Sequence, residues 1–482
     1  MFNSFIPTSL DYMRILPELI LSLAGVLIMF LEAIMTGSRK VLGYIAIVAL
    51  LAAAFAAWCQ TQGPAFHGMI VIDGMGSFFR VLVIVAGLLV VLGSGDYLKR
   101  QEQEGGEYYA LILFSIVGQC IMVTANELVM IFIGLEISSI ASYILAGYLR
   151  DDPRNNESAL KYFLLGSFAT AFLLYGVAWV YGATGTTNIS AIRQALTSSA
   201  HPSEALIGVA AALIFVGLAF KISAAPFQGW APDVYQGAPA PISGFLTVGP
   251  KAAAFAVLLR VFLDGFAPIS SRWLPVMWGC ALATMIVGNF AAIVQSNIKR
   301  LLAYSSIAHA GYVLVAIASD SVGGSAAAMF YLAAYAFTNI GAFLVVSFFA
   351  RKNEGYVAVE DFAGLSQRQP VLAAMLTIFL LSLIGVPLTG GFFGKFYIFK
   401  AALDSNLVWL SVLGLLNSAV AAYYYLRILV VMYMKEPVDS TKGLPQADPL
   451  LQVAIYASAI MTLVLGIFPD WVLNTAIAAA KH

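Results

Sequence analysis

Charge, cysteine and histidine are all scarce in this sequence. Only 10% of its 482 residues are charged, against roughly 25% in an ordinary soluble domain. The 25 basic and 25 acidic residues cancel, so the basic excess of a nucleic-acid-binding protein is missing. A soluble protein of this length would need far more charge to cover its surface. The 61% of hydrophobic residues instead indicates a polytopic membrane protein.

The sequence offers no obvious means of holding a redox centre. Its three cysteines, Cys59, Cys120 and Cys280, are far apart and form no C-x-x-C pair, which argues against an iron–sulfur cluster or a structural zinc. Of the four histidines, only His309 lies inside an apolar run, and a haem held by two histidines would need another there. We therefore expect no cofactor and no metal in this chain.

Long apolar runs fill most of the sequence. A membrane-spanning helix needs about 20 mostly apolar residues, and about fourteen such runs follow one another with only short polar stretches between them. The predicted fold is an all-α polytopic membrane protein of about 14 transmembrane helices. We expect three N-terminal helices in 1–107, two groups of five in 108–264 and 273–432, and a last loop and helix in 433–482.

Basic residues gather in alternate loops, and the opposite loops hold few. The rich loops hold 13 of them: Arg39, Lys40, Lys99, Arg100, Arg150, Arg154, Lys299, Arg300, Arg351, Lys352, Arg368, Lys435 and Lys442. An excess of lysine and arginine marks the cytoplasmic side of a membrane protein. With fourteen spans, both termini are then expected on the periplasmic side.

Five charged residues cannot be assigned to loops: Glu136, Lys161, Lys221, Lys251 and Lys395. A lysine at the bilayer centre costs on the order of 2.5–3.5 kcal/mol. These residues should therefore face protein or internal water, where they mark a proton or ion path by default. The alternative is that they reach the membrane surface or form static ion pairs. That alternative is strongest for Lys161, which lies near the cytoplasmic end of its run.

Polar residues recur on single helix faces. Glu136, Ser139 and Tyr143 have i, i+3, i+7 spacing, so they form one stripe that we expect to point into the bundle. Because an imidazole both accepts and donates a proton, His309 is a candidate proton relay. Two similar stripes are Ser305, His309 and Tyr312, and Tyr331, Tyr335 and Thr338.

Two overlong runs, 206–236 and 370–402, contain helix breakers. Pro226 follows Lys221, and Pro387 with several glycines precedes Lys395. Proline removes a helical hydrogen bond, and in lipid such breaks survive only where they line a cavity or are buried in protein. The two runs are five helices apart and so cross in opposite directions. This predicts two inverted five-helix repeats, helices 4–8 and 9–13, with helices 7 and 12 broken.

Four segments carry a resemblance to a known family. They are NELVMIFIGLE (126–136), KISAAPFQGWAPD (221–233), LAYSSIAHAGY (302–312) and GGFFGK (390–395). With the helix count, the chain resembles the antiporter-like membrane subunits of respiratory complex I, the NADH:quinone oxidoreductase. The N-type subunits fit best, because M-type subunits have a glutamate in place of Lys395 and L-type subunits are longer. Gln228 departs from relatives that have a histidine there, which puts a proton stop at that position in doubt.

The resemblance implies a non-redox subunit that moves protons across the membrane, coupled to electron transfer from NADH to quinone in other subunits. It implies an ion pair between Glu136 and Lys221, a central connection through Lys251 and His309, and proton exchange at Lys395. Lys161 matches a helix 6 lysine of the family.

The same resemblance implies partners and a location. The expected partners are an M-type neighbour and small K-type and J-type subunits, with FMN, iron–sulfur clusters and quinone held by other subunits. The location would be the bacterial inner membrane, in contact with the lipid bilayer and with no nucleic acid. An Mrp-type cation/proton antiporter is the main alternative, and a purely structural membrane spacer is a weaker one. Copurification with flavin- and iron–sulfur-containing proteins would separate them.

Overall fold

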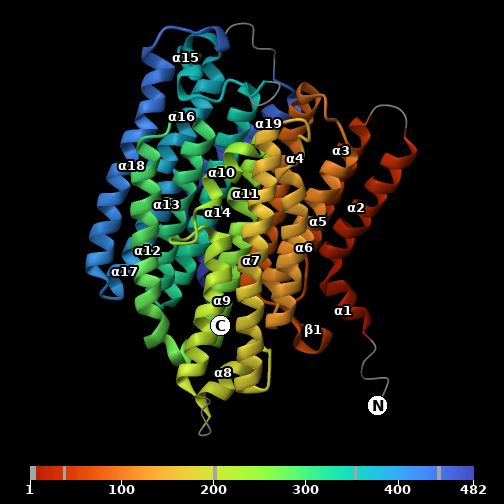
Figure 1. Ribbon diagram of the computed structural model, residues 1–482, viewed down its shortest axis with the longest axis vertical. Coiled ribbons are helices and arrows are strands. Elements are labelled where there is room, and N and C mark those ends of the chain that lie inside the picture. Colours follow the sequence, from red (N-terminus) through yellow and green to blue (C-terminus); the bar gives the residue numbers. More distant parts are fainter. Residues whose placement is uncertain (1–6, 36–38, 199–202, 352–354, 442–446, 482) are drawn as a thin grey trace.

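The computed structural model describes residues 7–35, 39–198, 203–351, 355–441 and 447–481, which form a bundle of long helices (Figure 1). Lys352 and Lys442, two of the basic residues used to predict the orientation, lie outside the described residues. Within the described ranges, thirteen helices are long and apolar enough to cross a membrane. A further expected span is split into α16 (Pro370–Ile384) and α17 (Gly390–Asp404). The predicted all-α, multi-pass fold is confirmed.

The helices follow one another with short connections. Before the first repeat come α1 (Ser9–Arg14), α2 (Leu16–Ile34), α3 (Lys40–Trp58), a small antiparallel hairpin of β1 (Gly63–Ala65) and β2 (Ile70–Ile72), and α4 (Gly74–Gln101). The first repeat holds α5 (Gly106–Thr124), α6 (Leu128–Ala146), α7 (Pro153–Thr184), α8 (Ile189–Thr197), α9 (Glu204–Ile222), α10 (Trp230–Gly237) and α11 (Ala240–Leu258).

The second repeat has the same plan. It holds α12 (Ser270–Ile293), α13 (Ile298–Ala318), α14 (Val322–Phe349), α15 (Leu365–Arg368), α16, α17 and α18 (Val408–Met434). The chain then continues into α19 (Pro449–Ile467) and α20 (Asp470–Ala480). A π-helical turn at Leu259–Gly265 and short 3-10 turns at Phe66–Gly68, Ala267–Ile269, Val359–Phe362 and Asp439–Thr441 complete the described structure.

Matching backbone hydrogen bonds show that the two repeats are related. In the first, Leu128 N–H donates to Thr187 O at 2.9 Å. In the second, Ile298 N–H donates to Val357 O at 2.8 Å. Ile298 and Val357 lie the same number of positions after Leu128 and Thr187, respectively. The same offset relates the return bonds, Ile189 to Asn126 and Val359 to Ser296. In Figure 1, α8, which follows the first link, lies at the lower end, and α15, which follows the second, lies at the upper end. The repeats are therefore inverted.

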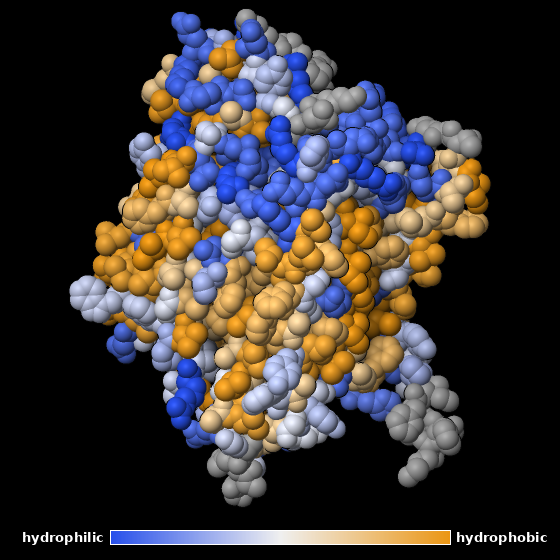
Figure 2. Space-filling view, viewed as in Figure 1, coloured by the Kyte–Doolittle hydropathy of each residue, from blue (hydrophilic) through white to orange (hydrophobic). Residues whose placement is uncertain are grey.

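Large apolar side chains cover much of the outside. Phe55 on α3, Phe168 on α7 and Trp409 on α18 are about two-thirds or more exposed. Figure 2 shows a broad apolar band on one face, with hydrophilic residues gathered above it. An apolar band of this extent is what contact with lipid requires. We call the hydrophilic end, where α3 and α13 begin and α4 ends, the basic-rich end.

Both ends of the described chain lie away from the basic-rich end. Phe66 N–H, in the loop between β1 and β2, donates to the Asp11 carboxylate of α1 at 2.8 Å. Ala479, near the end of α20, packs against Gly74, the first residue of α4. Since α4 ends at the basic-rich end, Gly74 and Ala479 lie at the other.

Three nearly fully buried helices, α11, α13 and α14, form the centre of the bundle. Helix α11 continues through Pro250 without a break and then passes into the π-helical turn. Helices 7 and 12 of the sequence prediction are broken as expected. Between α9 and α10 the chain turns at Ser223 (φ 59°), and between α16 and α17 it turns at Gly385 (φ 94°).

Candidate functional site

Lys395 lies at the break between α16 and α17. Its Nζ donates to the carbonyl oxygens of Leu383 at 2.9 Å and Ile384 at 2.8 Å, and to Ser418 Oγ of α18 at 2.8 Å. The last carbonyls of a helix have no helical partner, and the C-terminal end of a helix carries partial negative charge. The break therefore creates a site that holds a cation inside the bundle.

Lys221 occupies the last turn of α9, at the other break. Its Nζ donates to Ser139 Oγ of α6 at 2.7 Å. It also lies 5.2 Å from the ring centroid of Tyr143 and 5.4 Å from that of Tyr162, where the ring faces attract a cation. Trp230 Nε1–H donates to the carbonyl of Phe220 at 2.9 Å. This bond satisfies one of the carbonyls that the end of α9 frees.

Glu136 does not form the ion pair that the resemblance implied. Among the described residues, no ion pair joins it to Lys221, and its buried Oε1 has no hydrogen-bond partner. Ser139, one turn further along α6, takes the ammonium instead. The Ser139 and Tyr143 side chains are buried as expected, whereas Glu136 is only half-buried, beside the exposed Ile133 and Ile140. The carboxylate therefore lies toward the edge of the bundle.

Lys251 points from α11 toward α13. Its Nζ donates to Ser306 Oγ and, at 3.2 Å, to the Ser306 carbonyl. A cavity of about 10 Å³, the space of roughly one water molecule, is lined by Lys251, His309, Tyr331 and Tyr335. The cavity thus joins the ammonium of Lys251 to the imidazole of His309.

His309 is surrounded by tyrosines. Its Nδ1 hydrogen-bonds the Tyr331 hydroxyl of α14, and its Nε2 lies 3.2 Å from the Tyr425 hydroxyl of α18. Tyr312 contacts the imidazole edge-on at 5.6 Å and lies under the ammonium of Lys395 at 5.0 Å. One aromatic ring therefore separates His309 from Lys395.

Lys161 is only partly buried and forms ion pairs, which is the alternative named for it from the sequence. Its side chain is 41% exposed and forms ion pairs with Glu157 at 2.7 Å and Asp233 at 2.8 Å. Asp233 of α10 also pairs with Arg300 of α13 at 2.6 Å. These residues line a polar cavity of about 250 Å³ at the basic-rich end. Lys161 therefore belongs to an ion-pair cluster that ties the first repeat to the second.

The buried groups form two clusters in this structure. Lys251, His309, Tyr312 and Lys395 follow one another through the centre. Lys221 is separated from Lys251 by aromatic side chains: Tyr162 stacks on Trp230 at 4.6 Å, and Trp230 meets Tyr235 edge-on at 5.5 Å. The Lys251 ammonium lies over Tyr235 at 5.6 Å. A proton could pass along the central cluster, but passage from Lys221 requires the aromatic side chains to move or water to enter.

Comparison with known proteins identifies the family. A family model described as "NADH:quinone oxidoreductase/Mrp antiporter, TM" matches residues 125–421. This range contains Glu136, Lys161, Lys221, Lys251, His309 and Lys395. NADH-quinone oxidoreductase subunit N 1 of Solibacter usitatus is 60% identical over 98% of this chain and 98% of its own length. Subunit N of Trichlorobacter lovleyi is 43% identical, covering 97% of this chain and 96% of its own.

The chain belongs to the NADH-quinone oxidoreductase subunit N family. A chain of respiratory complex I from Thermus thermophilus with bound aureothin is 32% identical and superposes with a TM-score of 0.82, covering 96% of this chain and 100% of that chain. A chain of the Mrp complex from Dietzia sp. has a TM-score of 0.85 at 21% identity, covering 98% of this chain and 97% of its own. At that identity the second likeness concerns the fold alone.

Several residues of this subunit N family member were not singled out from the sequence. Asp233 pairs with Lys161, Ser418 accepts from Lys395, and Tyr425 hydrogen-bonds His309. Asp233 appeared only as the last residue of the segment 221–233, and no role was assigned to any of the three. A signal that could have pointed to Tyr425 is the run of three consecutive tyrosines, Tyr423 to Tyr425, in α18. Within the described residues, no group of three or more His, Cys, Asp or Glu side chains could hold a metal.

Proposed function

We propose that this chain moves protons across the membrane as a non-redox subunit of an NADH:quinone oxidoreductase, with Glu136, Lys161, Lys221, Lys251, His309 and Lys395 as its working residues. The observation that carries the proposal is the central cluster. Two buried ammonium groups, Lys251 and Lys395, flank an imidazole that is hydrogen-bonded on both ring nitrogens. Placing each ammonium group inside the bilayer costs free energy, which favours a functional role for these residues over a purely structural one.

Coupling would begin at Glu136 and Lys221. A carboxylate that approaches an ammonium strengthens its hold on the proton, and one that withdraws weakens it. The free Oε1 of Glu136 and the Ser139 bond of Lys221 correspond to the separated arrangement. Quinone reduction elsewhere in the complex would shift the pair between its two arrangements, and the proton released from Lys221 would move toward Lys251.

The far end of the path is Lys395. A proton that reaches Lys251 crosses the small cavity to His309, which accepts at one nitrogen and releases from the other. Lys395 then exchanges the proton with the membrane side away from the basic-rich end. On this proposal the basic-rich end is cytoplasmic, both termini are periplasmic, and the membrane is a bacterial inner membrane.

Partners follow from the same proposal. The chain would pack against an M-type neighbour and small K-type and J-type subunits. FMN, iron–sulfur clusters and quinone would be held by other subunits of the complex.

An Mrp-type antiporter remains the second candidate, since the matching family model covers both kinds of protein. Gentle detergent purification from native membranes separates the two. The proposal expects the chain to copurify with flavin, iron–sulfur clusters and NADH-driven quinone reduction, and expects sealed vesicles to take up protons when NADH is added. Copurification with cation-exchange activity and without NADH oxidation would overturn it.

A further inference from the structure

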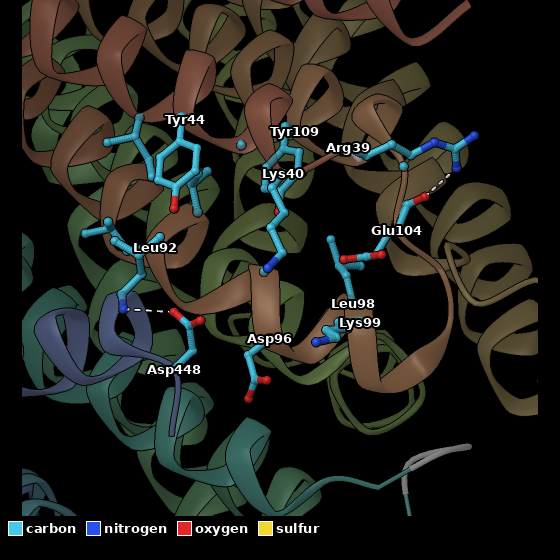
Figure 3. Close-up of a pocket in the computed structure, with 16 residues that line it drawn as sticks. Arg39, Lys40, Tyr44, Leu92, Asp96, Leu98, Lys99, Glu104, Tyr109 and Asp448 are labelled. Carbon is cyan, nitrogen blue, oxygen red and sulfur yellow. Dashed lines mark hydrogen bonds between the residues drawn. The ribbon is translucent and has the colours of Figure 1, made fainter. Parts of the chain in front are cut away.

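A cavity at the basic-rich end lies outside the proposed proton path. It has a volume of about 130 Å³ and is formed between α3, the end of α4 and the start of α19. Figure 3 shows Lys40 reaching into its middle, with Glu104 and Lys99 on one side and Asp448 on the other. The cavity therefore gathers charges of both signs in a small space.

These charges do not neutralise one another. Within the described residues, neither Lys40 nor Lys99 forms an ion pair, and Glu104 forms none through its carboxylate. Asp448 accepts only the backbone N–H of Leu450 at 2.9 Å. By contrast, Arg39 at the rim is already held by Glu32 at 2.9 Å. Asp96, a third carboxylate that lines the cavity, pairs with Arg100 at 3.3 Å. Two ammonium groups and two carboxylates thus face one cavity without ion-pair partners among the described side chains.

The cavity borders an exposed, largely apolar face of α3. Tyr44 lines it, and Val48, Leu51 and Phe55 continue from Tyr44 along the same face of α3 at helical spacing. All four are more than half exposed. A molecule whose charged part fills the cavity could therefore lay an apolar tail along α3, at the depth where acyl chains begin.

We propose that this cavity binds the headgroup of a phosphatidylethanolamine-type phospholipid. Its phosphate would accept hydrogen bonds from the Lys40 and Lys99 ammonium groups, and its own ammonium would donate to Glu104 and Asp448. Basic pockets between transmembrane helices bind lipid phosphates, but the two free carboxylates here would repel a purely anionic headgroup. A choline headgroup fits less well, since its quaternary nitrogen has no N–H to donate.

Photolabelling tests the site in the intact, purified membrane complex. Nanodiscs would carry phosphatidylethanolamine with a diazirine near the glycerol end of one acyl chain, and mass spectrometry would map the adducts. We expect adducts on residues 44–55. The double variant Lys40→Gln/Lys99→Gln should reduce them roughly thirtyfold, since each of the two lysines contributes about 1 kcal/mol to lipid binding.

Matched variants separate headgroup recognition from nonspecific contact. Lys40→Arg/Lys99→Arg keeps the charge and should keep the labelling. Lys435→Gln, which removes a lysine already paired with Glu360 at 2.5 Å, should not change it. Glu104→Gln/Asp448→Asn removes the carboxylates and should turn the preference toward a phosphatidylglycerol probe. Equal labelling of the native complex by ethanolamine, choline and glycerol probes would overturn the proposal, as would full labelling of the lysine-to-glutamine variant.

Discussion

The Nζ of Lys395 lies 2.8 Å from the carbonyl oxygen of Ile384, the last residue of α16. The helix break also binds the ammonium group of Lys395, because its free carbonyl oxygens stabilise a charge that would be unfavourable in the bilayer. The backbone and the lysine are interdependent: the carbonyls lack helical partners, and the ammonium is buried away from the protein surface.

Lys395→Ala should leave the complex assembled but cut NADH-driven proton uptake to about a tenth, a barrier change of roughly 1.4 kcal/mol. The reason is that no other described side chain would carry the proton at this break. Uptake would be measured by a pH-sensitive dye in sealed vesicles, with NADH oxidation as the reference. Lys395→Arg is the matched control for charge: it should keep assembly but not uptake, because arginine does not release its proton. Normal uptake by either variant would contradict the role.

His309→Ala should interrupt the central cluster and lower proton uptake by about tenfold or more, since general acid–base groups contribute roughly 10²- to 10⁴-fold. Tyr331→Phe removes the hydroxyl bonded to Nδ1 and should have a smaller effect of the same sign. Tyr304→Phe is the control, because Tyr304 lies beside Arg300 rather than in the central cluster. Equal uptake by the His309 variant and the control would argue for a packing role only.

Glu136→Gln should uncouple quinone reduction from proton uptake without unfolding the chain, because the carboxylate is half-buried and Oε1 has no partner to lose. The informative quantity is the ratio of protons taken up to NADH oxidised, which should fall. Ser139→Ala, which removes the present partner of Lys221, should alter the same ratio. An unchanged ratio in the Glu136 variant would mean that the carboxylate has no role in coupling.

Asp233→Asn should loosen the contact between the repeats, because one carboxylate pairs with both Lys161 and Arg300. All three side chains are partly exposed, so each pair contributes only about 0–1 kcal/mol. The expected result is a lower melting temperature of the detergent-purified complex. Glu157→Gln, at an exposed carboxylate that contacts Lys161 alone, should shift it less. A double-mutant cycle with Arg300→Gln measures the coupling, and a zero coupling energy would contradict the link.

Gly118→Val tests the packing of α5 against α6. A Cβ at Gly118 would lie 2.4 Å from the carbonyl oxygen of Gly134, which is backbone and cannot move aside easily. Overpacking of this kind typically costs about 1–3 kcal/mol, so the variant should lower the melting temperature and the yield of assembled complex. Gly182→Val is the matched control in α7, where no atom lies within 4 Å. A melting temperature equal to that of the control would show that α5 and α6 can separate freely.

The sequence by itself determined the membrane fold, because lipid leaves few choices. Runs of about 20 apolar residues must become helices, and the breakers beside Lys221 and Lys395 marked the two broken spans correctly. The buried state of Lys221, Lys251 and Lys395 also followed, since their runs offer no loop in which to place them. These inferences rest on local chemistry, which a single sequence records.

Only the tertiary structure decided which groups meet. Ser139 rather than Glu136 holds Lys221, Lys161 is a partly exposed member of an ion-pair cluster, and Asp233 joins the two repeats. Ser418 comes from the helix that follows Lys395 along the chain, and Tyr425 lies 116 residues after His309. Both are brought close by helix packing that no spacing rule specifies. The physical reason is that a helix fixes the direction of each side chain along its own axis, whereas the contacts of a charge depend on how neighbouring helices rotate and cross.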